Sequence, residues 1–275
     1  MPGGERYKRV RSAVSGCQLN TVCEEAHCPN IGECWDSGTA TFMILGKTCS
    51  RGCRFCAVTR GNQNGIVDSM EPSRVCAAAE RMELDYVVIT SVTRDDLKDG
   101  GASIFAETVR ALKGLNKPPL VELLTPDYWE ENLETVINSK PDVFAHNIEV
   151  VERLTPALRH RAFSYAHSLR VLAKARELDN KMLTKSSIML GIGETDDEIE
   201  SAMQDLRRAD VNILVLGQYL QPTKDHAPVT EYIAPEQFDA LRARGTELGF
   251  DFVAAGPLVR TSYKAAEAYA RKAIR

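Results

Sequence analysis

The chain has 275 residues, of which 44% are hydrophobic, 26% are charged and 7% are aromatic, and its net charge at pH 7 is −4. This composition is that of a globular protein long enough to bury a large core, and a slightly acidic chain gives no support for broad affinity to nucleic acids or membrane surfaces. The basic residues 1–11 lack the apolar region of a signal peptide, and no apolar run reaches the length of a transmembrane helix.

The N-terminal segment, residues 1–40, shows no strong periodicity, so we expect turns and short helices that a metal cluster would order. Cys23, Cys28 and Cys34 form the pattern C-x4-C-x5-C in this segment. A structural zinc ion with His27 as its fourth ligand is one alternative, although neighbouring side chains rarely reach one tetrahedral ion together. We favour an iron–sulfur cluster that takes its fourth ligand from elsewhere in the chain.

An apolar run at 41–45 predicts a buried strand, and the loop after it carries a second set of cysteines. Cys49, Cys53 and Cys56 form the pattern C-x3-C-x2-C, with an aromatic residue, Phe55, before the last cysteine. Zinc sites usually combine two pairs of cysteines to close four positions. Three thiolates on a four-iron cluster instead leave one iron open to a small chelating molecule.

The distribution of the eight cysteines argues against a disulfide framework. Seven of them lie between positions 17 and 56, whereas a framework is spread over the chain that it cross-links. Clustering indicates metal or redox chemistry in a reducing compartment. We expect Cys76, in a predicted helix, to be a small buried residue, and Cys17 lies outside both sets.

From residue 41 onward, short segments rich in Val, Ile and Leu alternate with helical patterns. Such segments are typical of parallel strands covered on both faces, and six βα units in series predict an α/β fold with either a barrel-like or an open doubly wound sheet. The expected strands are 41–45, 86–91, 120–124, 143–148, 185–190 and 213–219, with a last strand near 250–254. Helices are expected at 102–113, 127–138 and 165–179. Four more are expected: one begins at Pro72, one is capped by Thr195 and Glu198, one runs from Pro235 to Gly249, and one begins at about 263.

Ligands of both architectures bind at the carboxyl ends of the parallel strands, and polar residues occur at these ends. Asn147 and Glu149 are the strongest candidates, because they interrupt an apolar strand on the same alternating face. Ordinary loop hydrogen bonding is the alternative interpretation for each position. The full set of candidates is Thr90, Ser91, Asn147, Glu149 and Lys185.

Other polar features favour structural interpretations. The charged run with Arg94, Asp95, Asp96 and Asp99 is typical of a solvated loop, with a role in the site as the alternative. Gly191 to Glu194 is typical of a tight turn between a strand and a helix at the border of the ligand site. Four histidines show no metal-binding spacing and are interpreted as structural or surface residues: His146, His160, His167 and His226.

The cysteine sets and their surroundings resemble the lipoyl synthase family of radical S-adenosylmethionine (SAM) enzymes. The resemblance rests on TVCEEAHCPNIGECW (21–35) and TCSRGCRFCAV (48–58). It covers roughly residues 20–266 and continues in family order through TSVTRDDLKDGGASIFAETV (90–109), HNIEVVERL (146–154), KSSIMLGIGET (185–195), LGQYLQP (216–222) and VAAGPLVRTSYKA (253–265).

The resemblance implies a partial (β/α)6 TIM-like barrel of the radical SAM type, with N-terminal and C-terminal extensions covering the barrel mouth. Residues 1–40 would carry the cysteines of an auxiliary cluster, residues 41–249 would form the barrel, and residues 250–275 would supply a cluster ligand.

It also implies a sulfurtransferase with two [4Fe-4S] clusters and SAM as cofactors. The family inserts sulfur at C6 and C8 of an octanoyl group bound to a carrier-protein lysine, and such unactivated C–H bonds require radical chemistry. By resemblance, Cys49, Cys53 and Cys56 would hold the cluster that generates the radical, and the strand-end candidates above would contact SAM. The cluster at Cys23, Cys28 and Cys34 would be the sulfur donor, consumed in each turnover.

In the family, the auxiliary cluster takes a serine of a C-terminal R-S-S-Y motif as its fourth ligand. This chain has Arg260, Thr261, Ser262 and Tyr263 at the motif and so departs at the first serine. We assign the ligand to Ser262, and Thr261 stays open as the alternative. A hydroxyl oxygen is a poorer iron ligand than a thiolate, which suits a ligand that leaves when sulfur is removed.

The resemblance implies a set of partners as well. These are octanoylated lipoyl carrier domains (2-oxoacid dehydrogenase E2 subunits and the glycine cleavage H protein), an electron donor such as ferredoxin or flavodoxin, and an iron–sulfur carrier protein, with neither nucleic acid nor membrane. We expect a monomer in the cytoplasm, or in an organelle matrix if a transit peptide has been removed. The rival functions are biotin synthase-like sulfur insertion, methylthiolation of tRNA, and a zinc-binding interaction module.

Overall fold

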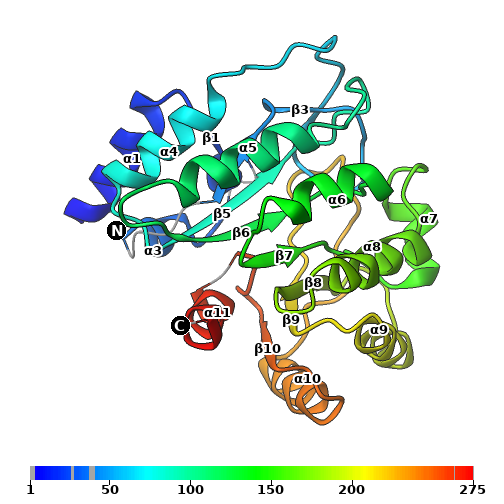
Figure 1. The fold of residues 1–275 in the computed structure, drawn as a ribbon. Coiled ribbons are helices and arrows are strands. Elements are labelled where there is room, and N and C mark those ends of the chain that lie inside the picture. The colour runs from blue at the N-terminus through cyan, green and yellow to red at the C-terminus, as the bar shows by residue number, and fades with distance from the viewer. Residues whose placement is uncertain (1–3, 26–27, 37–40, 263, 275) are drawn as a thin grey trace. The chain divides into compact units, whose positions relative to one another are not determined.

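The computed structural model describes residues 4–25, 28–36, 41–262 and 264–274. The chain divides into two compact units, each built from parallel strands and flanking helices (Figure 1). Unit 1 contains Met1–Arg51 and Val58–Asp142, and unit 2 contains Gly52–Ala57 and Val143–Arg275. The loop with the second cysteine set is therefore shared, because Cys49 belongs to unit 1 and Cys53 and Cys56 belong to unit 2.

Unit 1 contains three parallel strands and one short antiparallel strand at their edge. Its sheet has the order β1 (Asn20–Thr21), β2 (Thr41–Ile44), β5 (Tyr86–Ser91) and β6 (Leu120–Leu124). A separate parallel pair is formed by β3 (Thr48–Cys49) and β4 (Thr59–Arg60). The helices are α1 (Glu5–Gly16), α2 (Val22–Glu25), α3 (Ile31–Asp36), α4 (Glu71–Arg81), α5 (Ala102–Lys113) and α6 (Glu130–Asn138).

Unit 2 contains four parallel strands in sequential order. They are β7 (Val143–Ala145), β8 (Leu183–Leu190), β9 (Ile213–Gln218) and β10 (Phe252–Gly256). The helices are the 3-10 helix η1 (Glu152–Leu154), α7 (Thr155–Leu158), α8 (Tyr165–Leu178), α9 (Asp196–Arg208), α10 (Pro235–Glu247) and α11 (Lys264–Ile274).

Helix α9 shows how the sequence determines local structure in unit 2. Thr195 Oγ1 accepts a hydrogen bond from the backbone nitrogen of Glu198, and the Glu198 carboxylate accepts one from the backbone nitrogen of Thr195, as the capping box predicted. The apolar face of the helix then packs into the buried cluster that β8 and β9 share with α8 and α10. Complete burial of one such side chain stabilises the fold by roughly 1.5–3 kcal/mol.

The predicted α/β class is confirmed, whereas several local bounds differ from the prediction; the helix expected at 127–138, for example, begins at Glu130. Residues 5–16 form a regular helix where short pieces were expected, because Val10, Ala13 and Val14 give it a buried face. The strand expected at 143–148 ends at Ala145, although Glu149 makes an isolated parallel bridge to Ile188. The arrangement of both extensions over one barrel mouth involves the two units together and stays a prediction.

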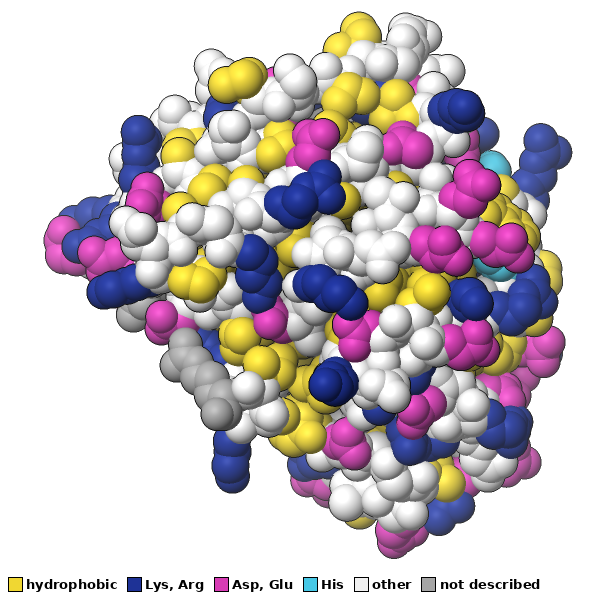
Figure 2. Space-filling model, in the orientation of Figure 1, with side chains coloured by type: hydrophobic (Ala, Val, Ile, Leu, Met, Phe, Trp, Pro, Cys, Tyr) yellow, Lys and Arg dark blue, Asp and Glu magenta, His cyan; other side chains and the backbone are white. Residues whose placement is uncertain are grey.

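The surface carries charges of both signs. On the face shown in Figure 2, Lys and Arg side chains are interspersed with Asp and Glu side chains. This mixture agrees with the weak net charge of the chain. Among the described residues, no helix has both the length and the hydropathy needed to cross a membrane.

Candidate functional site

The first cysteine set lies in a short helical segment of unit 1. Cys23 belongs to α2 and Cys34 to α3, and the backbone nitrogen of Cys28 donates to the carbonyl oxygen of Cys23 at 3.0 Å. Strand β1, immediately before this segment in the sequence, pairs with β2, immediately after it, and Asn20 lies opposite Met43. This pairing holds the first cysteine set at the edge of the sheet. His27, the alternative zinc ligand, lies outside the described residues.

The surroundings of Cys23 disfavour the charged, thiolate form of its side chain. Burial raises the pKa of the Cys23 thiol, and the nearby Cys28 raises it further, although a hydrogen bond from the Thr41 backbone acts in the opposite direction. Thiolates so close together repel one another unless a cation lies between them. A bound metal cluster supplies the missing positive charge, so this thiol set fits a metal centre better than it fits isolated anionic cysteines.

Cys49 is held at the end of β3 in unit 1 by backbone contacts. Its carbonyl oxygen accepts from the backbone nitrogen of Gly61 at 2.9 Å, and its sulfur lies 3.4 Å from the backbone nitrogen of Arg51. N–H groups that point at a sulfur are typical of the contacts that orient a metal-ligating cysteine. The residue therefore has the local environment of a metal-ligating cysteine.

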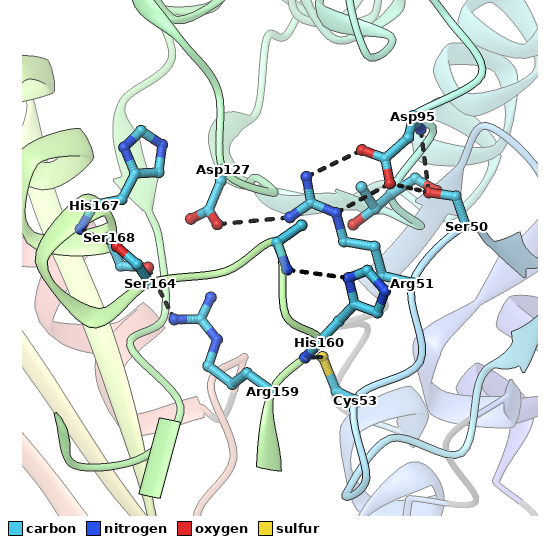
Figure 3. Close-up of polar contacts among 12 residues, drawn as sticks. Ser50, Arg51, Cys53, Asp95, Asp127, Arg159, His160, Ser164, His167 and Ser168 are labelled. Carbon is cyan, nitrogen blue, oxygen red and sulfur yellow. Dashed lines mark hydrogen bonds and ion pairs between the residues drawn. The ribbon is translucent and has the colours of Figure 1, made fainter. Parts of the chain in front are cut away.

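Arg51 is the centre of a polar cluster at the carboxyl ends of β5 and β6. Its guanidinium lies between Asp95, which accepts two hydrogen bonds at 3.0 and 3.1 Å, and Asp127, at 3.7 Å (Figure 3). Ser50 also donates to Asp95 at 2.7 Å. Arg51, Asp95 and Asp127 border a cavity of about 180 Å³ within unit 1, whose lining includes the exposed Trp129.

Arg94 corrects the interpretation of its charged run as a solvated loop. Only 1% of Arg94 is exposed, and its guanidinium donates to the Leu45 and Ile66 carbonyl oxygens at 3.1 and 2.8 Å. It also pairs with Asp96 at 2.8 Å, which holds the pKa of that carboxyl well below its usual range. Arg94 therefore fastens the segment after β2 to the segment that precedes α4.

Cys53 and Cys56 lie in the part of the cysteine loop that belongs to unit 2. The Cys53 sulfur accepts from the backbone nitrogen of His160 at 3.3 Å (Figure 3), and the next residue, Arg54, donates to the Leu158 carbonyl oxygen at 2.7 Å. Phe55 packs against a buried cluster that includes Leu158 and Tyr219. The loop after β7 thus holds the cysteine segment from one side.

The loop between β9 and α10 holds the same segment from another side. The backbone nitrogen of Ala227 donates to the Arg54 carbonyl oxygen at 2.8 Å, and His226 Nε2 lies 3.0 Å from the Cys56 carbonyl oxygen. His226 was interpreted from the sequence only as a structural or surface residue. Its partner is a backbone atom 170 positions away, so no side-chain pattern could have indicated this contact.

The two candidates at the end of β5 differ in their contacts. The Thr90 hydroxyl donates to the Leu124 carbonyl oxygen on the neighbouring strand at 2.8 Å. Ser91 Oγ is buried and makes no hydrogen bond within the described residues. Because buried polar atoms usually have partners, Ser91 is the better candidate for contact with a bound molecule.

Asn147 and Glu149 lie together after β7 in unit 2. Asn147 is 8% exposed, and its Nδ2 donates to Glu149 Oε1 at 3.2 Å, while its Oδ1 is buried without a hydrogen bond in the described part of the chain. Desolvation raises the pKa of Glu149, although Arg159 and Asn147 oppose the shift. Lys185, on the neighbouring β8, is buried opposite Ala145. This strand end therefore offers an unused acceptor and a carboxyl group.

The C-terminal motif is near the same strand end in unit 2. Asn147 Nδ2 also donates to Thr261 Oγ1 at 3.1 Å, and Ser262 follows as a half-buried residue in a turn. The predicted link between Ser262 and Cys23, Cys28 and Cys34 joins residues of both units and stays a prediction.

The chemistry of the donor set fits iron–sulfur clusters. All eight cysteines belong to the described residues and are thiols. Within those residues, no three Cys, His, Asp or Glu side chains are arranged around a position for a single metal ion. A four-iron cluster is wider than one ion and holds its thiolates at its corners. The sequence analysis missed Arg51 and Asp127 and assigned no contact to Arg94 or His226, since the contacts of all four depend on tertiary structure.

Comparison with known proteins identifies relatives over nearly the whole chain. Residues 43–206 match a model of the Radical SAM superfamily. Lipoyl synthase of Halorhodospira halophila is 54% identical over 266 residues, which cover 96% of this chain and 80% of the relative. The chloroplastic lipoyl synthase of Ricinus communis is 50% identical over 281 residues (100% and 77%), and mitochondrial lipoyl synthase 1 of Drosophila yakuba is 51% identical over 274 residues (97% and 72%).

Solved structures share the fold at low sequence identity. The FeFe-hydrogenase maturase HydG from Carboxydothermus hydrogenoformans is 13% identical, with a TM-score of 0.59 over 98% of this chain and 78% of that chain. Streptococcus suis SuiB bound to precursor peptide SuiA is 11% identical, with a TM-score of 0.59 over 82% of this chain and 52% of that chain. These similarities support the fold, whereas the close relatives carry the family assignment.

Proposed function

We propose that this chain, which belongs to the lipoyl synthase family of radical SAM enzymes, divides its reaction between its two cysteine sets. The chain is a sulfurtransferase that inserts sulfur at C6 and C8 of a protein-bound octanoyl-lysine, and its cofactors are two [4Fe-4S] clusters and SAM. The observation that carries the division of roles is the presence of two separate sets of three cysteines, each one ligand short of four.

Cys49, Cys53 and Cys56 would hold the cluster that acts on SAM, and three ligands leave this cluster one position short of four. When bound, this cluster supplies the electron that cleaves SAM to the radical needed for C–H bonds. The protein's part is to fix the loop. The backbone nitrogens of Arg51 and His160 point at the sulfurs of Cys49 and Cys53, which supports their role as thiolate ligands.

SAM itself contacts residues at the strand ends. Among the proposed contact residues, Asn147 Oδ1 and Ser91 Oγ are buried and make no hydrogen bond in the described part of the chain, so both atoms suit the hydroxyl or amino groups of SAM. Glu149 supplies a carboxylate beside Asn147. Thr90 and Lys185 complete the proposed set, in which Thr90 has an acceptor lone pair left after its bond to Leu124.

Cys23, Cys28 and Cys34 hold the auxiliary cluster, with Ser262 as its fourth ligand, and this cluster supplies the sulfur. Burial raises the pKa of Cys23 and the nearby Cys28 raises it further, so thiolates at these positions would need the positive charge that a metal cluster supplies. In terms of segments, we propose that residues 1–40 carry this cluster, residues 41–249 form the radical SAM barrel, and residues 250–275 supply the ligand.

The substrate is a lipoyl carrier domain that bears an octanoyl group. We infer that E2 subunits of 2-oxoacid dehydrogenases and the H protein of glycine cleavage are the carriers. A ferredoxin or flavodoxin supplies electrons, an iron–sulfur carrier rebuilds the spent cluster, and the chain acts as a monomer. A reducing compartment suits the thiols, so we infer the cytoplasm or an organelle matrix, as the names of the chloroplastic and mitochondrial relatives suggest.

Single substitutions in each cysteine set test the division of roles. Cys53→Ala is expected to abolish the formation of 5′-deoxyadenosine from SAM. Cys28→Ala is expected to keep that activity and to lose sulfur insertion, and Cys76→Ala, outside both sets, is the matched control. Equal loss of SAM cleavage in both site variants would contradict the proposal.

Metal content separates this proposal from the zinc-binding alternative. The anaerobically purified chain is expected to be brown and to contain about eight iron atoms. A colourless chain with one or two zinc ions would contradict the iron–sulfur assignment.

A further inference from the structure

The C-terminal segment at residues 256–261 is closely fitted to unit 2. A Cβ atom at Gly217 of β9 would lie 2.3 Å from the Val259 carbonyl oxygen, so the segment requires glycine there. The same carbonyl accepts from Arg260 Nη1 at 2.7 Å, and the Val259 backbone nitrogen donates to the Gly256 carbonyl oxygen at 3.1 Å. Contacts with β9 and β10 therefore fix Val259 and Arg260, which lie immediately before Thr261 and Ser262.

Asn147 fixes the segment from the other side. The two donor hydrogens of its amide are both accounted for, because Nδ2 lies 3.2 Å from Glu149 Oε1 and 3.1 Å from Thr261 Oγ1. Only 8% of Asn147 is exposed and Thr261 is half-buried, so the contact between them is partly shielded from water. Glu149 holds the amide in the orientation that presents its second hydrogen to Thr261.

The two hydroxyl groups of the motif therefore differ. Thr261 Oγ1 already accepts a hydrogen bond, which uses one of its two lone pairs. Ser262 is half-buried, and within the described residues its hydroxyl makes no hydrogen bond.

We propose that Asn147 positions the C-terminal segment through the Thr261 hydroxyl, so that Ser262 alone is the oxygen ligand of the auxiliary cluster. Thr261 and Asn147 are positioning residues for this ligand. The inference rests on the proposed function, in which the cluster at Cys23, Cys28 and Cys34 takes an oxygen ligand from this segment. It assigns Asn147 a second role, because its Oδ1 atom remains available to SAM.

The test uses the full chain with Cys49, Cys53 and Cys56 replaced by Ala, so that only the auxiliary cluster contributes to the spectrum. Chains reconstituted with 57Fe are examined by Mössbauer spectroscopy for the iron site that carries the oxygen ligand. Ser262→Ala is expected to eliminate this site. Thr261→Val is expected to reduce its population about fivefold, the value of one hydrogen bond, and Thr261→Ser is expected to restore it.

Coupling between the two positioning residues provides a second measurement. Asn147→Leu is expected to lower the population of the same oxygen-ligated iron site. The double variant Asn147→Leu/Thr261→Val is expected to show the same population as either single variant, because both changes remove one contact. Circular dichroism of each variant shows whether the fold is kept. Should Thr261→Val misfold, the Asn147→Leu variant alone decides the outcome.

Several results would overturn the inference. A normal oxygen-ligated site in Thr261→Val and in Asn147→Leu would remove the positioning role, while leaving the proposed function intact. Loss of the site in Thr261→Val with retention in Ser262→Ala would make Thr261 the ligand. A chain that binds no iron at Cys23, Cys28 and Cys34 would overturn the proposed function and this inference together.

Discussion

His226 Nε2 lies 3.0 Å from the carbonyl oxygen of Cys56, and the two residues are 170 positions apart in the sequence. Thr223 Oγ1 lies 2.9 Å from Nδ1 of the same ring. Since a carbonyl oxygen only accepts, Nε2 carries the proton and Nδ1 accepts from the Thr223 hydroxyl. The loop between β9 and α10 thereby holds the backbone of a proposed cluster ligand through one defined tautomer.

Replacing His226 with Phe is expected to loosen the cluster loop without removing a ligand. The variant loses its donor to Cys56, so the cluster at Cys49, Cys53 and Cys56 is expected to lose iron to a chelator about fivefold faster than the unaltered chain. His226→Gln restores an N–H donor and is expected to recover most of the difference. The reduced cluster's electron paramagnetic resonance signal follows the loss.

Lys224→Ala is the matched control for this loop, because Lys224 is exposed and makes no hydrogen bond or ion pair within the described residues. It is expected to behave as the unaltered chain does. Equal iron loss in His226→Phe and Lys224→Ala would show that the contact with Cys56 is unimportant.

Neighbouring residues at the end of β5 provide a test of the SAM site. Ser91→Ala removes a buried hydroxyl that has no hydrogen bond in the described part of the chain, so it is expected to weaken SAM binding about fivefold. Thr90→Val removes a hydroxyl that donates to Leu124, so its main effect is expected on stability. Calorimetric titration with SAM compares the affinities of both variants. A larger loss of SAM affinity in Thr90→Val than in Ser91→Ala would contradict the choice of Ser91 as the better SAM contact.

Secondary structure that depends on interactions between neighbouring residues could be predicted from the sequence of this chain. The capping box at Thr195 and Glu198 gives the start of α9, and the β-branched run at 86–91 gives β5, because both depend on neighbouring residues. The cysteine patterns and the strand-end position of Asn147 and Glu149 were also visible in the sequence.

Long-range contacts were not accessible in this way. Arg94 looks like part of a solvated charged run, but it is buried because two backbone carbonyls and Asp96 satisfy its guanidinium. His226 and Thr261 have partners more than 100 positions away. Pattern analysis identifies residue types at fixed spacing, whereas these contacts depend on how the loops fold back.

Arg94 is expected to be important for stability. Arg94→Met leaves Asp96 and two carbonyl groups without their buried donor, so it is expected to lower the free energy of unfolding by about 3 kcal/mol at pH 7. Arg94 lowers the pKa of Asp96, so the pair's contribution is fully present above the unfolded pKa of about 4 and is lost as pH falls through the lowered folded value. Urea unfolding measures the change in the free energy of unfolding. Arg110→Met is the control, because Arg110 is exposed. Equal effects of the two substitutions would contradict the stabilising role of Arg94.

Removal of iron is expected to affect the N-terminal segment selectively. The short helices α2 and α3 carry the first cysteine set, and helices of this length are unstable alone. Hydrogen exchange of their backbone amides is expected to accelerate by at least about tenfold when a chelator removes the clusters. The amides of α9, which is stabilised by its capping box and core packing, serve as the internal control. Unchanged protection in α2 and α3 would mean that no cluster orders them.

The most direct test of the two-cluster account is isotopic. The chain is reconstituted anaerobically with iron and 34S-sulfide, freed of excess sulfide, and incubated with SAM, a reductant and an octanoylated carrier domain. Mass spectrometry of the carrier is expected to show the gain of two 34S atoms, with no more than one modified carrier per chain, because the auxiliary cluster is consumed. An unmodified carrier, despite the formation of 5′-deoxyadenosine and intact clusters, would contradict lipoyl synthesis by this chain.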